Sequence, residues 1–201
     1  SRNLVIHISS LGPNISNKTQ IRLTNLKKKI SRKIAESKAT LILSFDESRF
    51  GTHSKISHGW FECGTRPQVP LKIGYQNFYL YSAVNSSDGS NFNLILPKVD
   101  TNHMNVFLSE LSKKYPSDKI ALIMDGAGWH KSKDLKIPKN IVVFYFPPYC
   151  PELNPVERLW LYVKNNILSN RIYEKIEDIE IKLCEFMNQL QNEVVKNICS
   201  L

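Results

Sequence analysis

Three short and almost continuously apolar segments predict the centre of a sheet. They span residues 41–46 (LILSFD), 120–125 (IALIMD) and 141–146 (IVVFYF). Segments this short and this apolar are typical of strands buried on both faces, as in a parallel sheet. The first two segments each end in an aspartate.

Two further segments, 77–84 (NFYLYSAV) and 92–96 (FNLIL), alternate between apolar and polar residues. The stretch 85–90 (NSSDGS) between them is rich in turn-forming residues. This pattern predicts an antiparallel hairpin with a glycine-containing loop.

Helical spacing of apolar residues predicts four helices. The first is basic and amphipathic, and the third begins with Asn154 as N-cap, Pro155 at the first helical position and Glu157 at the third. The helices are expected at 20–38, at 101–115, from 155, and at 174–197. Together with the strands, they predict an α/β fold whose mixed sheet combines an antiparallel hairpin with parallel strands.

The length and composition agree with one globular domain preceded by an arm. The chain has 201 residues, of which 42% are hydrophobic and 22% charged. We expect a basic arm or linker at 1–40 and the folded domain at 41–201. No apolar run approaches the roughly 18 residues of a membrane span, and the first residues make a poor secretory signal. Because the sequence does not begin with Met, we expect a fragment or a trimmed chain.

Positive charge is concentrated at the N-terminal end. The net charge is +9, and residues 1–40 hold nine Lys or Arg but one acid, Glu36. Such a distribution favours a polyanion partner, although a solvated basic helix without a partner has the same pattern. The four cysteines have no metal-binding spacing, which predicts free thiols in a reducing cytosol.

Three carboxylates form the candidate active site. Asp46 and Asp125 follow strands whose carboxyl ends should meet at one edge of the sheet, where α/β folds place their ligands. Close carboxylates repel each other unless a cation balances them, and Mg²⁺ or Mn²⁺ prefers such oxygens. Glu157, in the first turn of the next helix, can add a third ligand. The alternatives are that both aspartates are turn residues and that Glu157 completes a capping box with Asn154.

Three motifs around these acids resemble a known family. FDESRF at 45–50, MDGAGWH at 124–130 and FPPYCPELNPVERLW at 146–160 resemble the catalytic motifs of the mariner-like transposase superfamily, and the bacterial insertion-sequence branch is the nearest match. The resemblance covers about residues 41–170. It implies a ribonuclease H-like fold and a catalytic, metal-binding triad of Asp46, Asp125 and Glu157.

The resemblance also implies the chemistry and the partners. We expect metal-dependent cleavage of transposon-end DNA and strand transfer with two Mg²⁺ or Mn²⁺ ions, by a homodimer at the bacterial nucleoid in the cytoplasm. Glu47, His130 and Asn154 match motif positions near the metals or the DNA. The interval between Asp125 and Glu157 is 31 residues, which is shorter than the resemblance implies.

Basic residues of the arm and near the motifs are the candidate DNA contacts. They would bind phosphates and add little sequence specificity. They are Lys27, Lys28, Lys29, Arg32, Lys33, Arg49, Lys131 and Arg158. Trp129 could stack on a base, whereas Trp160 lies in the apolar stripe of its helix and is expected in the core. The alternative functions are an inactive remnant that only binds DNA, a ribonuclease H-like nuclease acting on hybrids or junctions, and a structural domain.

Overall fold

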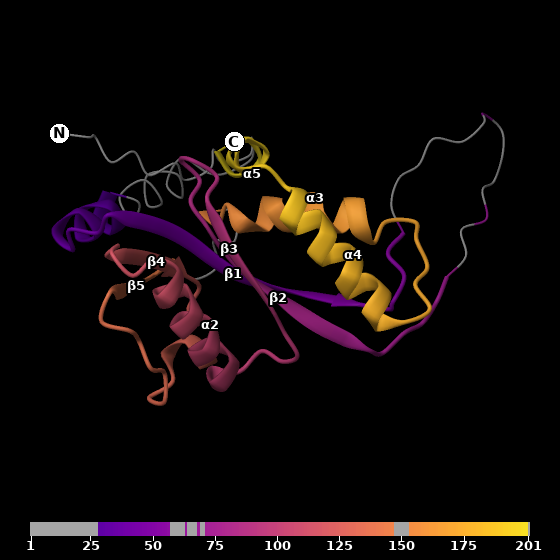
Figure 1. Ribbon diagram of the computed structural model, residues 1–201, viewed down its shortest axis with the longest axis horizontal. Helices are drawn as coiled ribbons and strands as arrows, with labels where there is room; N and C mark the ends of the chain where they lie inside the picture. The colour runs from indigo at the N-terminus through magenta and orange to yellow at the C-terminus, as the bar shows by residue number, and fades with distance from the viewer. Residues whose placement is uncertain (1–27, 57–62, 64–67, 69–70, 147–152, 201) are drawn as a thin grey trace, which may run out of the picture.

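The computed structural model describes residues 28–56, 63, 68, 71–146 and 153–200. Its centre is a mixed five-stranded sheet in the order β3-β2-β1-β4-β5 (Figure 1). The antiparallel hairpin pairs with β1, while β4 and β5 run parallel to β1, as the sequence predicts. The strands are β1 (Leu41–Gly51), β2 (Asn77–Val84), β3 (Asn91–Leu96), β4 (Ile120–Met124) and β5 (Ile141–Tyr145).

Helices cover both faces of the sheet (Figure 1). Helix α2 (Thr101–Lys114) packs on one face, and its bounds confirm the predicted helix at 101–115. The other face is covered by α3 (Val156–Ile167), α4 (Ile176–Gln189) and α5 (Asn192–Ser200). A short helix at 28–36 precedes the sheet. It confirms part of the predicted basic helix at 20–38, of which residues 20–27 lie outside the described part.

Alternating side chains of β1 point to opposite faces of the sheet. Leu43 and Phe45 are buried in the core beneath α2, whereas Phe50 is buried with α3. Asp46 therefore faces α3, and Glu47 faces the α2 side. The alternation therefore places Asp46 and Glu47 on opposite faces of the sheet.

Strand β1 is longer than the sequence predicts. The expected strand ended at Asp46, but β1 continues to Gly51. The reason is its pairing, because β2 accompanies β1 from Ser44 to Gly51 whereas the parallel pairing with β4 stops at Ser44. Asp46 consequently lies within a strand, just beyond the point where β1 loses its parallel neighbour.

The predicted single helix at 174–197 is two helices, so that prediction was wrong. The break falls at Leu190, whose φ of −72° and ψ of 109° are extended. A straight helix over 174–197 would extend about 36 Å and carry its end away from the core that Val195 and Cys199 share with α4. Helix α5 instead begins against the β2–β3 turn, where a Cβ on Gly89 (φ +77°) would lie 1.7 Å from the carbonyl oxygen of Asn192.

Two remaining expectations concern thiols and membranes. Cys63, Cys184 and Cys199 are free, as predicted, while Cys150 lies outside the described residues. Among the helices of the described part, none has the length and apolarity needed to cross a bilayer.

Candidate active site

Asp46 is a mostly buried carboxylate at the interface between β1 and α3. The indole Nε1 of Trp160 donates a hydrogen bond of 2.9 Å to its Oδ2. Burial, and after it the negative charge of Glu157, raise the pKa of Asp46 to about 7. The site therefore holds two mutually repelling acids, and the ionised form of Asp46 is disfavoured at neutral pH.

Glu157 is held in place through the start of α3. Its side chain is exposed, in the first turn of the helix. The amide of Asn154 donates to the Phe45 carbonyl oxygen at 3.1 Å, and its side-chain oxygen accepts from the Val156 backbone N–H at 3.2 Å. Helix α3 begins at Val156 with Pro155 as its N-cap residue, one residue later than predicted. The Asn154 side chain nevertheless bonds the first helical N–H and ties the helix to the residue before Asp46.

Asp125 belongs to a second cluster, in which His130 lies between two carboxylates. The His130 Nδ1 lies 2.7 Å from Asp125 Oδ1, and its Nε2 lies 2.8 Å from Glu47 Oε1. His130 is only 1% exposed, and the Glu47 side chain is 7% exposed. The indole of Trp129 adds a hydrogen bond of 3.2 Å to the same Glu47 oxygen.

The electrostatics of this second cluster favour a charged imidazole. Burial opposes protonation, but the hydrogen bonds to Asp125 and Glu47 raise the pKa of His130 to about 9. The hydrogen bond from His130 in turn lowers the pKa of Asp125. At neutral pH, an imidazolium therefore lies between Asp125 and Glu47, which come from adjacent strands of the sheet.

Local structure explains why His130 reaches Asp125. Asp125 follows the last residue of β4, and its Oδ1 accepts a hydrogen bond from the Ala127 backbone N–H at 3.1 Å. The chain then folds into a short 3₁₀ helix, η1 (Gly128–Lys131). The Tyr145 hydroxyl, at the end of β5, donates to the His130 carbonyl oxygen at 2.7 Å. This loop turns the imidazole back toward the sheet.

The three predicted acids lie at the same end of the parallel strands but are not gathered into one group. Ser44 pairs with Ile123, so Asp46 and Asp125 stand two residues beyond a shared register position. Within the described residues, no three His, Cys, Asp or Glu side chains are placed to hold one ion. Asp46 is coupled chiefly to Glu157, whereas Asp125 is coupled to His130, which also contacts Glu47.

Comparison with known proteins identifies the family. Residues 41–180 match the DDE superfamily endonucleases. The chain belongs to this family. An uncharacterized protein from Sinorhizobium fredii, y4pE/y4sA, is 40% identical over 116 residues, which cover 57% of this chain and 86% of that protein. The five-stranded sheet and its flanking helices form the ribonuclease H-like fold that the motifs imply.

Solved structures of Mos1 mariner transposase share this fold. The isolated Mos1 catalytic domain matches with a TM-score of 0.59 at 12% identity, over 94% of this chain and 91% of that one. A Mos1 paired-end complex with the left transposon end matches with a TM-score of 0.66 at 16% identity, over 98% of this chain. The present chain spans 63% of that longer transposase chain. Other similar Mos1 structures contain Mn or Mg.

The candidate DNA contacts of this member of the DDE superfamily are spread over several surfaces. Lys28, Lys29, Arg32 and Lys33 are exposed on the helix at 28–36, and Arg49 is exposed on β1. Lys131 lies 5.2 Å from the centre of the Tyr145 ring. Arg158 instead donates to the Cys199 carbonyl oxygen at 3.1 Å. Lys27 lies outside the described residues.

Two tryptophans contribute contacts that the sequence does not reveal. Trp160 is buried in the core, as predicted, yet its indole N–H also binds Asp46. Trp129 is 37% exposed, so the prediction that it stacks on a base stays open. Glu157 and Trp160 are one helical turn apart, which places them on the same side of α3. This spacing is the sequence signal that could have indicated that both act on Asp46.

Proposed function

We propose that this DDE endonuclease domain is the catalytic domain of a DNA transposase. It would cut phosphodiester bonds at transposon ends and join the released ends to target DNA, with Asp46, Asp125 and Glu157 as ligands of Mg²⁺ or Mn²⁺. The observation that carries this proposal is the Asp46–Glu157 pair. Burial, and after it the negative charge of Glu157, raise the pKa of the mostly buried Asp46 carboxyl to about 7.

The residues at the site suit a hard divalent cation. All three candidate ligands offer carboxylate oxygens, which Mg²⁺ and Mn²⁺ prefer. A cation beside Asp46 would remove its repulsion with Glu157. Both hydrogen bonds of Asp125 from described residues use Oδ1, so its Oδ2 remains open to another partner. Bound divalent ions supply Lewis-acid chemistry in phosphoryl transfer, activating the attacking oxygen and stabilising the leaving one.

The other residues of the site would orient the three acids. Asn154 fixes the start of α3, and with it Glu157, relative to β1. Trp160 fixes one oxygen of Asp46. His130 holds Asp125 ionised and directs one of its oxygens. Such contacts around metal ligands typically change affinity or activity by about 10–100-fold.

DNA is the substrate that we infer for this site. The net charge of +9 favours a polyanion, and the exposed basic residues of the 28–36 helix would bind its phosphates. The Mos1 structures are described as paired-end and strand transfer complexes. We infer by analogy that two copies of the present protein act together on two DNA ends.

A nicking assay on supercoiled plasmid and on duplex DNA with Mn²⁺ or Mg²⁺ tests the proposal. We expect wild type to nick DNA, and Asp125→Ala and Glu157→Gln to lose about 100-fold or more, because even indirect contacts to metal ligands are worth about 10–100-fold. Asp134→Asn is the matched control, since Asp134 is an exposed acid outside the site. Equal nicking by all variants would refute the roles assigned to the acids.

A second candidate is a protein that binds DNA without cutting it. The observation that favours it is the separation of Asp125, held by His130, from the Asp46–Glu157 pair within the described residues. This candidate predicts salt-dependent DNA binding but no metal-dependent cleavage, even of pre-cut ends. Preferential cleavage of RNA–DNA hybrids would instead identify a ribonuclease H-like nuclease.

A further inference from the structure

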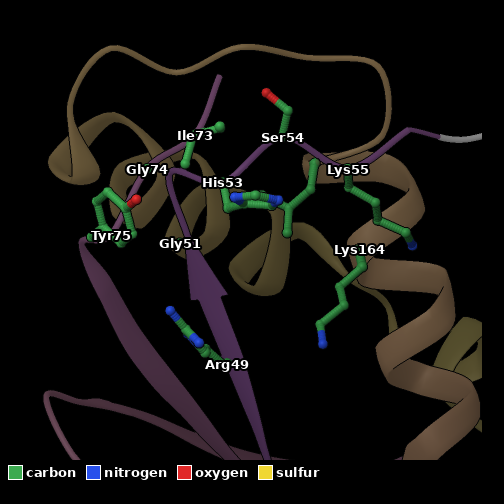
Figure 2. Close-up of a pocket in the computed structure, with 10 residues that line it drawn as sticks. Arg49, Gly51, His53, Ser54, Lys55, Ile73, Gly74, Tyr75 and Lys164 are labelled. Carbon is green, nitrogen blue, oxygen red and sulfur yellow. The ribbon is translucent and has the colours of Figure 1, made fainter. Parts of the chain in front are cut away.

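A basic cleft lies beyond the end of β1, next to the candidate active site. Its volume is about 710 Å³, and acidic residues are absent from its described lining. The side chains that carry the argument are Arg49, His53, Lys55, Tyr75 and Lys164. Figure 2 shows Arg49 and Lys164 on either side of the end of β1, with Lys164 reaching across from α3.

The chain around this cleft is held by backbone hydrogen bonds. The Ser54 N–H donates to the Lys72 carbonyl oxygen at 3.0 Å, and the Asn170 N–H donates to the Lys55 carbonyl oxygen at 2.9 Å. The segment after β1 is thus tied both to the segment before β2 and to the end of α3. Gly74 permits the close approach, because a Cβ there would lie 2.0 Å from Thr52 Oγ1. The walls of the cleft are therefore held in place by the fold itself.

Positive charge in the cleft lacks a balancing acid at close range. Neither Arg49 nor Lys164 forms an ion pair with any residue that the structure describes. Lys55 Nζ has a neutral partner, the side-chain oxygen of Asn165 at 2.9 Å. Burial, and after it the charge of Lys55, lower the pKa of Lys164. An anion in the cleft would relieve this repulsion.

The cleft is electrostatically connected to the acids. Lys164 follows Glu157 by two helical turns, or about 10 Å along α3, and therefore lies on the same side of the helix. The charges of Glu157 and Asp46 both act on Lys164. A nucleic acid strand that has one phosphate at the acids could therefore extend into the cleft with its neighbouring phosphates.

We propose that this basic cleft binds the DNA strand beside the phosphodiester bond that is cut, with backbone phosphates of that strand held by Arg49, Lys55 and Lys164. Tyr75 then stacks on a base of the same strand. Its side chain is 84% exposed at the rim, and grooves for single strands combine basic side chains with such aromatic rings. This ring favours a nucleic acid strand over a small inorganic anion. The inference rests on the proposed function for its substrate.

Fluorescence anisotropy with a labelled single strand, in EDTA and over a series of salt concentrations, tests the cleft without requiring cleavage. We expect Lys164→Gln to reduce the slope of log affinity against log salt by about 0.7, the value for one phosphate contact of a single strand. Lys164→Arg should keep the wild-type slope. Tyr75→Ala should weaken binding about fivefold or more, the lower end for a stacked base, with an unchanged slope.

Lys139→Gln is the matched control, because Lys139 is exposed and precedes β5 at the opposite end of the parallel strands. A slope for Lys164→Gln equal to that of this control overturns the proposal. The proposal is also overturned if Lys164→Gln alters only the competition of inorganic phosphate with the labelled strand, because that result would indicate a small-anion site. Weaker DNA binding by Tyr75→Ala would not be due to misfolding, since an exposed ring contributes little to the stability of the fold.

Cleavage assays separate this inference from the proposed function. If Lys164→Gln changes the slope while wild type never nicks DNA, the cleft binds DNA and the transposase proposal fails. If wild type nicks DNA in a manner that depends on Asp125 but Lys164→Gln matches the control, the transposase proposal stands and the cleft inference fails.

Discussion

Replacing Asp46 by Asn should stabilise the metal-free fold at neutral and alkaline pH. Its pKa rises from 3.8 to about 7 on folding, so the folded state binds more protons between these values. Stability from this group is therefore full below pH 3.8 and is lost as the pH rises through about 7. A rise of this size corresponds to about 4 kcal/mol as an upper limit.

The measured gain should be smaller, about 2–3 kcal/mol, because Asp46 is partly exposed and water screens its charge. The Asn carbonyl oxygen can still accept the hydrogen bond from Trp160, so the substitution removes the charge and keeps that contact. In a protein of this size, such a gain raises Tm by about 5–10 °C.

Urea denaturation of wild type and Asp46→Asn in EDTA, at pH 4 and pH 8, measures this effect. We expect the variant to be more stable at pH 8, with little difference at pH 4. Asp134→Asn, an exposed acid, should match wild type at both values. Adding Mn²⁺ should then stabilise wild type and not Asp46→Asn, because a ligand that binds only the folded state raises its stability.

Two results would refute the reasoning. If Asp46→Asn is neutral or destabilising at pH 8, the carboxylate is not under electrostatic strain in the folded protein. If Mn²⁺ stabilises both proteins equally, Asp46 is not a metal ligand. Either result would remove the observation on which the proposed function chiefly rests.

Further substitutions test the contacts that orient the acids and the turn against which α5 begins. His130→Ala should cost about 3–5 kcal/mol of unfolding free energy in urea denaturation, since the buried Glu47 loses its charged partner and keeps only the Trp129 hydrogen bond. If His130 and Glu47 act together, adding Glu47→Gln to this variant should cost less than Glu47→Gln alone. The stability that His130 gains from its raised pKa is present below pH 6.5 and should disappear in wild type as the pH rises through about 9, which a pH series of unfolding free energies would reveal. Asn154→Ala should cost about 2 kcal/mol by removing the hydrogen bond to the first helical N–H and the buried hydrogen bond to the Phe45 carbonyl oxygen. Asn154→Asp, which keeps only the bond to the helix, should recover part of this in the same assay. Gly89→Ala should lower Tm by displacing the start of α5; an unchanged Tm would contradict the close approach at that turn.

The sequence predicted the sheet because its strands have distinct patterns. The apolar runs before Asp46 and Asp125 reflect burial on both faces, and the alternation at 77–84 and 92–96 reflects the hairpin. It did not predict the full length of β1, since the pairing partner of residues beyond Asp46 is β2, which is distant in sequence. It also missed the break at Leu190, because both helices keep the same apolar periodicity.

The candidate site divides in the same way. The motifs by themselves predicted the acids of the candidate site and determined the family and the ribonuclease H-like fold, because residue type and spacing are local properties of the chain. Only the tertiary structure decided that Asp46 is coupled to Glu157 and Trp160, that His130 joins Asp125 to Glu47, and that Lys164 lines a basic cleft with Lys55. Burial and charge coupling depend on distances through space between β1, α3 and η1, and no spacing along the chain records those distances.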